Sequence, residues 1–398
     1  MKIVTVIGAR PQIIKAAALS RAISQHFSKE VHEVIVHTGQ HYDNNMSQVF
    51  FDELGVPQPD YNMGVGSAPH GVQTARMIEG IEEILLKEKP DCLVLYGDTN
   101  STLAGAIAAS KIHVPIVHIE AGLRSFNKSM PEEINRICCD HCSTLLFSPT
   151  ATGFKNLVNE GFNPSNKKKF TADNPGIYHC GDVMYDNSKY FATIADQKSD
   201  ILERERLKGK GYVLCTIHRD NNTDQPERLN AIFSALLKIA AEKTVVLPLH
   251  PRTSKLLNTN LKKDIFDKLS NNPNIRILPP ASFLDMIVLE RHADMVVTDS
   301  GGVQKEAYFF QKPCLIMRSE TEWKEIVDCG AAVITDADEQ KILKAYRNFT
   351  DNPPHSYPEI FGDGHAAEFI CKEMLENFQI KCRVYQKNFY LCSLKIKH

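Results

Sequence analysis

The stretch KIVTVIGARPQIIK, residues 2–15, decides the fold class. Its first six residues are mostly apolar and partly β-branched, which predicts a buried strand over 2–7. A glycine turn follows at position 8, and the residues after it have the pattern of a helix. A strand, a glycine turn and a helix in this order form the first half of a βαβ unit. Residues 2–15 therefore predict an α/β protein with a parallel sheet.

The same pattern recurs in both halves of the chain, which predicts two sheets. The strand-like runs of the first half are 2–7, 33–37, 92–96, 115–119 and 144–147. Those of the second half are 212–217, 244–249, 275–278, 295–298 and 313–317. A polar stretch over roughly 163–211 separates the two sets.

We therefore expect two Rossmann-like, doubly wound domains, one over residues 1–175 and one over 176–365. A helix at about 366–380 is expected to pack back on the first domain, and residues 383–398 form a tail without an interpretable pattern. Ligands of such folds bind beyond the carboxyl ends of the strands. The expected active site is the cleft between the two domains.

The composition indicates a globular protein that stays in the cytoplasm. The chain has 398 residues, of which 43% are hydrophobic, and 46 basic against 48 acidic residues give a formal charge of −2. This balance provides no global field for a nucleic acid or an anionic membrane. No apolar run approaches the roughly 20 residues of a membrane span, and the run over 3–7 is too short for a signal peptide.

The 11 cysteines are expected to be free thiols, because most lie in apolar runs. The cluster of Cys138, Cys139, His141 and Cys142 could suggest a metal site, but it lies on a helix-like run and lacks the second ligand pair of a zinc site. We expect no metal.

Two glycine turns are candidate anion sites. GARPQIIK, residues 8–15, joins exposed amides at a helix start to the cations Arg10 and Lys15. TDSGGVQKEA, residues 298–307, places Ser300, Gly301 and Gly302 between a buried strand and a helix, where backbone amides can approach a phosphate. One turn later, Glu306 could accept hydrogen bonds from a ribose diol. A strand–helix turn without a ligand would also explain both patterns.

Acidic residues follow the strands of the first half, at Asp98, Glu120, Glu132 and Glu133. Carboxylates gathered at one site raise one another's proton affinity, which produces general acids and bases at neutral pH. The alternatives are helix capping for Asp98 and a solvated first-turn charge pattern for the two glutamates with Arg136. The position of Asp98 and Glu120 at strand ends favours chemistry.

Two histidines end strands of the second half. His218 lies in HRDNNTD, residues 218–224, and His250 precedes Arg252 in PLHPRT, residues 248–253. A single histidine is more often structural than functional. Two histidines at equivalent strand ends favour a role in ligand binding.

The motifs GARPQIIK, YGDTNS, HIEAGLRS, PEEINR, HRDNNTD and TDSGGVQKEA, in this order, resemble the non-hydrolysing UDP-N-acetylglucosamine 2-epimerases. The resemblance implies a GT-B fold, a homodimer, a UDP-binding second domain and no nicotinamide or metal. It implies that UDP-GlcNAc and UDP-ManNAc interconvert by elimination of UDP to a 2-acetamidoglucal and re-addition, in the supply of surface-polysaccharide precursors. Matching by motif assigns catalysis to Asp98, Glu120, Glu132 and His218. It assigns binding of UDP or substrate to Arg10, Lys15, Arg136, His250, Ser300, Gly301, Gly302 and Glu306.

Two departures from the family pattern concern the sugar. The usual GTRPE opening has Ala9 and Gln12 here, and SETEWKE, residues 319–325, replaces the usual TERPE. Both variants resemble the branch that acts on UDP-2,3-diacetamido-glucuronic acid. Gln40 and His41 match part of the segment with which many bacterial members bind UDP-GlcNAc as an effector, but residues 62–69 lack its arginine. A GT-B glycosyltransferase, a hydrolysing epimerase and a non-catalytic UDP-sugar sensor are the alternative functions.

Overall fold

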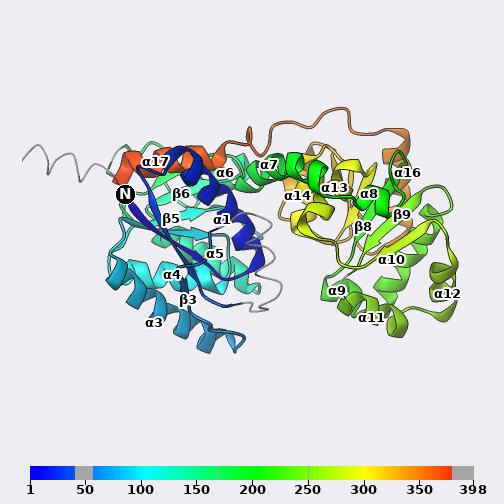
Figure 1. Cartoon of the computed structure of the whole chain (residues 1–398), viewed down its shortest axis with the longest axis horizontal. Coiled ribbons are helices and arrows are strands. Elements are labelled where there is room, and N and C mark those ends of the chain that lie inside the picture. Colours follow the sequence, from blue (N-terminus) through cyan, green and yellow to red (C-terminus); the bar gives the residue numbers. More distant parts are fainter. Residues whose placement is uncertain (41–56, 168, 250, 379–398) are drawn as a thin grey trace, which may run out of the picture. The chain divides into compact units, whose positions relative to one another are not determined.

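The computed structural model describes residues 1–40, 57–167, 169–249 and 251–378. The chain divides into two compact units (Figure 1). Unit 1 contains the described residues of Met1–Asn187 and of Phe361–His398, and unit 2 is Ser188–Ile360. The predicted His250 and His41, and the predicted tail over 383–398, lie outside the described residues.

Unit 1 is built on a seven-stranded sheet in the order β3-β2-β1-β4-β5-β6-β7, and every pair in it is parallel. Its strands are β1 (Lys2–Ile7), β2 (His32–His37), β3 (Tyr61–Asn62), β4 (Cys92–Tyr96), β5 (Ile116–Ile119), β6 (Leu145–Ser148) and β7 (Gly176–His179). Its helices are α1 (Arg10–Ala22), the π-helix η1 (Ile23–Phe27), α3 (His70–Glu88), α4 (Asn100–Lys111), α5 (Pro131–Cys142), α6 (Ala151–Asn159) and α17 (Ala366–Phe378).

Alternation along the strands gives this sheet two buried faces. Val4, Val6, Val34 and Val36 pack with apolar residues of α3, α4 and α5. Between them, Thr5 points to the other face, where its hydroxyl donates to Glu33, which also accepts from Ser20 of α1. The first unit is therefore a three-layer α/β unit.

Unit 2 repeats this architecture with a six-stranded sheet in the order β10-β9-β8-β11-β12-β13, also parallel throughout. Its strands are β8 (Tyr212–Thr216), β9 (Thr244–Pro248), β10 (Ile275–Leu278), β11 (Met295–Thr298), β12 (Cys314–Ile316) and β13 (Ala332–Ile334). Its helices are α8 (Ile201–Arg204), α9 (Asp220–Thr223), α10 (Pro226–Ile239), α11 (Pro251–Asn260), α12 (Lys263–Asn271), α13 (Phe283–His292), α14 (Gly301–Phe309), α15 (Lys324–Asp328) and α16 (Glu339–Asp351).

In both sheets the order of the strands reverses next to the first strand of the unit. The reversal lies between β1 and β4 in unit 1 and between β8 and β11 in unit 2. The crevice at such a reversal is where open α/β sheets bind ligands. The predicted turns at Gly8 and Asp98 follow β1 and β4, and those at His218 and Ser300 follow β8 and β11. Each unit thus carries predicted site residues at its own ligand-binding edge.

The expected boundary between 175 and 176 is wrong by one strand. Residues 176–179 form β7, which pairs with β6 and so belongs to the first sheet. The chain leaves unit 1 within α7 (Val183–Lys198), after Asn187, and returns at Phe361. The helix expected at about 366–380 is α17, whose described part ends at Phe378. Its first amides, those of Ala366 and Ala367, donate to Asp186 of unit 1.

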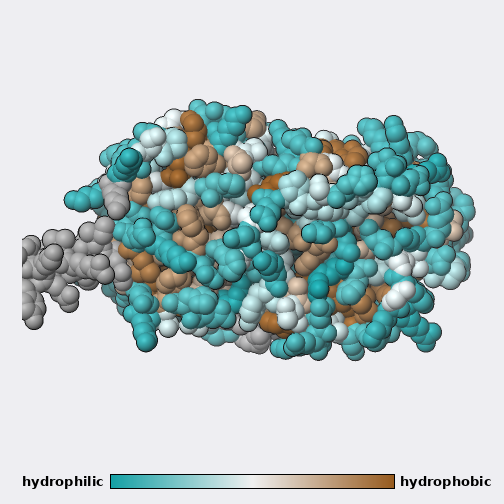
Figure 2. All heavy atoms as spheres, turned by 90° about the horizontal axis from the view of Figure 1, so that it is seen from above, coloured by the Kyte–Doolittle hydropathy of each residue, from teal (hydrophilic) through white to brown (hydrophobic). Residues whose placement is uncertain are grey.

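The surface and the helices add two observations. On the face in Figure 2, hydrophobic residues are scattered among hydrophilic ones. None of the helices in the described part of the chain combines the length and the apolar character of a membrane span.

Candidate active site

The turn between β1 and α1 is fixed by the side chain of Gln12. Its amide oxygen accepts from the backbone N–H groups of Gly8 (2.9 Å) and Ala9 (3.2 Å). Its amide nitrogen donates to the carbonyl of Tyr96 at the end of β4 (2.9 Å). The expectation of exposed amides at this turn is therefore wrong for Gly8 and Ala9, because the buried Gln12 already occupies them. The exposed Arg10 opens α1 beside this turn.

Lys15 and Glu120 form an ion pair at the carboxyl edge of the first sheet. Each side chain is 13% exposed, so the pair is shielded on most sides. Glu120 has a left-handed backbone (φ 76°), a conformation that costs a non-glycine residue free energy and is common at functional sites. Gly97 has a φ of 60°, which glycine adopts without strain, and a β-carbon there would lie 3.1 Å from Lys15 Nζ.

Asp98 is paired with Arg136 of α5. The alternative that Asp98 caps α4 is wrong, because Thr99 is the cap and its hydroxyl accepts from the amide of Thr102. Burial raises the pKa of Asp98 above its ordinary value, although Arg136 and Lys15 act in the opposite direction. Glu120 raises it further, so the two carboxylates influence each other. The structure thus brings Asp98, Glu120, Lys15 and Arg136 together at one strand edge.

The adjacent residues Glu132 and Glu133 differ in their surroundings. Glu133 is buried and accepts from the backbone amides of Ser125 (3.0 Å) and Phe126 (2.9 Å) and from Arg136 Nη1 (2.5 Å). Burial alone would raise the pKa of Glu133, but these hydrogen bonds lower it. Glu132 is exposed in the first turn of α5. The alternative of a solvated charge pattern with Arg136 is therefore wrong for Glu133, whose ion pair with Arg136 is buried. Glu132 is the carboxylate that is exposed to solvent.

His118 and Asp140 lie behind this edge and were not predicted as site residues. His118 Nδ1 is 2.6 Å from Asp140 Oδ1, and both side chains are fully buried. Asp140 also binds Arg124 Nη1 (2.7 Å) and accepts from the amide of Gly122 (3.1 Å). The sequence contained a signal for His118. In HIEAGLRS this histidine lies two residues before Glu120, and along a strand its side chain points to the face opposite that of its apolar neighbour Ile119.

In unit 2, Asp299 holds the turn that carries His218. Its carboxylate accepts from the backbone amides of His218 (3.1 Å) and Arg219 (3.1 Å) and from Asn222 Nδ2 (3.1 Å). It also lies 3.0 Å from His218 Nδ1. Burial raises the pKa of Asp299, but the hydrogen bonds from His218, Arg219 and Asn222 outweigh it and lower the pKa overall. Sequence reasoning missed this role, because Asp299 reads as part of the glycine turn.

Ser300 is the N-cap of α14, and its hydroxyl accepts from the amide of Val303. A β-carbon at Gly302 would meet only the Ser300 hydroxyl, at 3.8 Å, so the backbone at Gly302 is open to a ligand. Arg318 forms a bidentate ion pair with Glu322 (2.8 and 2.9 Å) beside this turn. Trp323 Nε1 donates to the backbone carbonyl of Gly301 (3.0 Å). The variant SETEWKE segment therefore lies directly against the predicted phosphate turn.

The remaining predicted residues of unit 2 lie on helices. Glu306 is partly buried on α14, and it faces the buried Glu290 of α13. Burial, and then the charge and hydrogen bond of Glu306, raise the pKa of Glu290 well above its ordinary value. Arg252, the residue predicted beside His250, binds Asp220 (2.6 Å) and Asp224 (2.7 Å). Among the described residues, no three histidine, cysteine or carboxylate side chains converge as a metal site.

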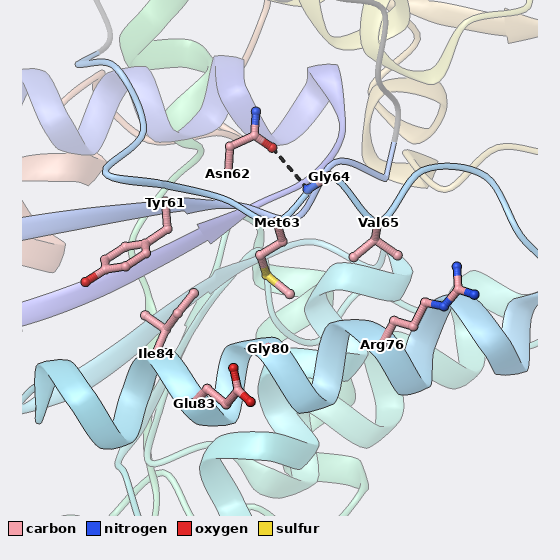
Figure 3. Close-up of a pocket in the computed structure, with 9 residues that line it drawn as sticks. All are labelled: Tyr61, Asn62, Met63, Gly64, Val65, Arg76, Gly80, Glu83 and Ile84. Atoms are coloured by element: carbon pink, nitrogen blue, oxygen red, sulfur yellow. Dashed lines mark hydrogen bonds between the residues drawn. The ribbon is translucent and has the colours of Figure 1, made fainter.

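A separate pocket of about 430 Å³ lies on unit 1, where β3 and the residues after it pass over α3 (Figure 3). Met63 points down onto Gly80 of α3, where a β-carbon would come within 2.6 Å of the methionine methyl. The lining residues are Tyr61, Asn62, Met63, Gly64, Val65, Arg76, Gly80, Glu83 and Ile84. None of them is a predicted site residue.

Comparison with known proteins shows the family to which the chain is similar. A model of the family described as UDP-N-acetylglucosamine 2-epimerase matches residues 24–375. A UDP-2,3-diacetamido-2,3-dideoxy-D-glucuronate 2-epimerase of Pseudomonas aeruginosa is 46% identical over 94% of this chain and 100% of its own. A UDP-N-acetylglucosamine 2-epimerase of Methanocaldococcus jannaschii is 39% identical over 94% of this chain and 98% of its own.

Solved structures give the same result. The crystal structure of the Methanocaldococcus jannaschii UDP-GlcNAc 2-epimerase in complex with UDP-GlcNAc and UDP has a TM-score of 0.81 and 38% identity, over 94% of this chain and 100% of its own. That of the Neisseria meningitidis enzyme bound to UDP-GlcNAc has a TM-score of 0.79 and 27% identity, over 95% and 100%. The expected GT-B fold class is confirmed. By its motifs, its fold and these relatives, the chain belongs to the UDP-N-acetylglucosamine 2-epimerase family.

Proposed function

We propose that this protein is a non-hydrolysing epimerase that inverts carbon 2 of a UDP-linked N-acetylated sugar, with UDP-GlcNAc and UDP-ManNAc as its substrate pair. The single observation that carries the proposal is the group of Asp98, Glu120, Lys15 and Arg136 at the carboxyl edge of the first sheet. Two carboxylates held by two cations can take a proton from one face of a carbon and return one to the other.

The reaction is an elimination followed by an addition. A carboxylate removes the proton on carbon 2 while the bond between carbon 1 and the UDP oxygen breaks, and its electron pair leaves with UDP. The ring is left with a double bond between carbons 1 and 2. A proton then adds to the other face of carbon 2, and the UDP oxygen attacks carbon 1. No electrons are gained or lost, so the chemistry requires no redox cofactor.

The proton on carbon 2 is not beside a carbonyl, so departure of UDP must lead the reaction. We propose that His218 and the turn over Ser300 to Gly302 stabilise the departing diphosphate, and that Glu306 binds the ribose. Asp299 supports this role of His218. It lies within hydrogen-bond distance of His218 Nδ1 and accepts from the backbone amides of His218 and Arg219, so it fixes the orientation of the imidazole ring. A donor placed in this way commonly lowers the activation free energy by about 3 kcal/mol.

In this proposal, Arg10 and Lys15 are the cations of unit 1 that bind UDP or the substrate. Glu132, whose carboxylate is exposed to solvent, acts with Asp98 and Glu120 as a general acid or base. Arg136 holds Asp98, and His250 is assigned to substrate binding by its motif alone. We further propose that the enzyme acts in the cytoplasm as a homodimer, without a metal or a nucleic-acid partner.

A second substrate is favoured by a specific observation. The relative named for UDP-2,3-diacetamido-2,3-dideoxy-D-glucuronate is 46% identical to this chain, as is a UDP-N-acetylglucosamine 2-epimerase homolog of Methanococcus maripaludis. The variant segment with Arg318, Glu322 and Trp323 lies against the glycine turn, where it could distinguish substrates. The diacetamido-uronate is therefore the alternative substrate for the same chemistry.

The test is epimerisation in deuterated water, followed by proton NMR at carbon 2. Incubation with UDP-GlcNAc is expected to yield product that carries deuterium at carbon 2 and keeps its UDP, because a carboxylate exchanges its proton with water. Asp98→Asn is the matched control and should abolish the exchange. Complete retention of the original hydrogen would exclude this mechanism, and release of free N-acetylmannosamine would indicate a hydrolysing enzyme. A parallel incubation with the diacetamido-uronate separates the two substrates.

A further inference from the structure

His118 makes two short contacts from a fully buried position on β5. Its Nδ1 is 2.6 Å from Asp140 Oδ1, and its Nε2 is 2.8 Å from the backbone carbonyl oxygen of Gly97. A carbonyl oxygen can only accept a hydrogen bond, and an ionised carboxylate can only accept as well. Both ring nitrogens of His118 must therefore donate. A neutral imidazole has only one N–H group, so the contacts require the imidazolium.

The charges around the ring agree with this count. Asp140 takes part in two further interactions that favour its ionised form, one with the amide of Gly122 and one with Arg124. Arg124 in turn binds Glu160 (2.6 Å). Two buried cations, His118 and Arg124, thus face two carboxylates, and the ring's remaining titratable neighbour is the thiol of Cys139. Burial lowers the pKa of His118, but Cys139 and Asp140 raise it more, so the net shift is upward.

The contact with Gly97 connects this cation to the carboxylates. The amide of Gly97 donates to the carbonyl of Ile119 (3.0 Å), and its carbonyl accepts from His118. Gly97 is therefore held on both sides by consecutive residues of β5, in a turn with φ of 60°. Asp98 follows Gly97 directly, and Glu120 follows Ile119. These two hydrogen bonds of Gly97, from here on called the clamp, thus set the position of both carboxylates.

We propose that His118 is a positioning residue, a permanently protonated imidazolium whose hydrogen bond to Gly97 fixes Asp98 and Glu120 for proton transfer. The link to proton transfer rests on the proposed epimerase function, whereas the protonation state does not. A displacement of about 1 Å in such a constellation can reduce the rate about 100-fold.

The protonation state is tested in the wild-type protein by NMR of histidine labelled with ¹⁵N in the ring. Both ring nitrogens of His118 are expected to carry protons from about pH 6 to about pH 9, through the range in which an ordinary histidine titrates. His37 is the internal control, because it is also buried at a strand end but its Nδ1 accepts from the amide of Gly39 (3.0 Å), and burial lowers its pKa. A single ring proton on His118 at pH 7 would overturn the imidazolium.

The clamp is tested by two neutral variants that differ in reach. His118→Gln places an amide N–H near the original Nε2 and can still donate to Gly97, whereas His118→Asn places its N–H near Nδ1 and can donate only toward Asp140. We expect kcat to fall about 100-fold in His118→Asn and distinctly less in His118→Gln, with KM little changed in both. The double variant His118→Asn/Asp98→Asn should be little slower than Asp98→Asn alone, because the hydrogen bond to Gly97 acts on the residue directly before that carboxylate.

Equal kcat values in the two variants, or a full additive loss in the double variant, would exclude the positioning role. Thermal unfolding of each variant identifies any loss that comes from misfolding, and the ring protonation of the wild type tests the proposal even if His118→Asn does not fold. If the wild type does not epimerise the sugar, the proposed function fails, and the NMR result still decides the protonation state.

Discussion

At the scale of single residues, two neighbouring glutamates at the start of α5 differ in how the protein holds them. PEEINR gives Glu132 and Glu133 the same local pattern, yet only the second is buried, because α5 turns it toward the amides of Ser125 and Phe126. Gln12 and Asp299 were missed for a related reason. Each holds backbone amides of a neighbouring turn, and a hydrogen bond to a backbone leaves no pattern in side-chain types.

The two glutamates should respond in opposite ways to the same substitution. Glu133→Gln is expected to lower the free energy of unfolding by about 1–3 kcal/mol, because one oxygen that accepts from an amide or from Arg136 becomes an NH₂ donor. Glu132→Gln should leave stability within about 0.5 kcal/mol, as is usual on a surface, and reduce kcat about 100-fold. Urea unfolding and the deuterium assay measure the two effects. A stable but slow Glu133→Gln with a fully active Glu132→Gln would reverse the assignment.

At the scale of helices and strands, most of the fold was predictable because the central strands are long and apolar. β1, β4, β8, β9 and β11 follow their predicted runs closely. The missed strands β3, β7 and β13 have two, four and three residues, and each lies at an edge of its sheet. β7 also lies in the polar stretch that was interpreted as the domain boundary. The failures of prediction are thus confined to strands at sheet edges, whereas the inner strands of both sheets were predicted.

The junction between α7 and α17 predicts a pH dependence of stability. Asp186 accepts from the first two amides of α17, and burial raises its pKa to about 6. The unfolded chain loses this proton near pH 3.9 and the folded chain only near pH 6, so stability falls as pH rises through that window. The difference of about two pH units corresponds to about 3 kcal/mol.

Asp186→Asn should remove this component, since an amide does not titrate. Urea unfolding of both proteins at several pH values between about 4 and 7 measures it, and the difference between the two curves isolates Asp186 from other carboxyls. Asp338→Asn at the cap of α16 is the matched control for the loss of a capping carboxylate that is only partly buried. A constant difference between wild type and Asp186→Asn across this range would contradict the prediction.

At the scale of the whole molecule, the two units differ in how the chain builds them. Unit 2 is one continuous segment, and its main core runs from Val213 to Phe349 without residues of unit 1. Unit 1 needs two segments, because α17 returns to it. Phe369 of α17 packs edge-on against Phe147 and Tyr178 of the first sheet. This return was foreseen from the helix pattern at 366–380, but its attachment to Asp186 was not.

This difference predicts how fragments of the chain behave. A fragment of residues 188–360 should fold alone with a cooperative thermal transition, because its sheet, its core and its Phe191–Phe283 contact are intact. The matched fragment 1–187 lacks α17, so Asp186 loses its amides and the first sheet loses Phe369, and its transition should be broad or absent. Calorimetry compares the two. Fragment 188–360 retains His218 and the Ser300 turn, so it should still bind UDP in titration calorimetry, but without Asp98 and Glu120 it should exchange no hydrogen at carbon 2. A cooperative fragment 1–187 beside an unfolded fragment 188–360 would contradict this account of the two units.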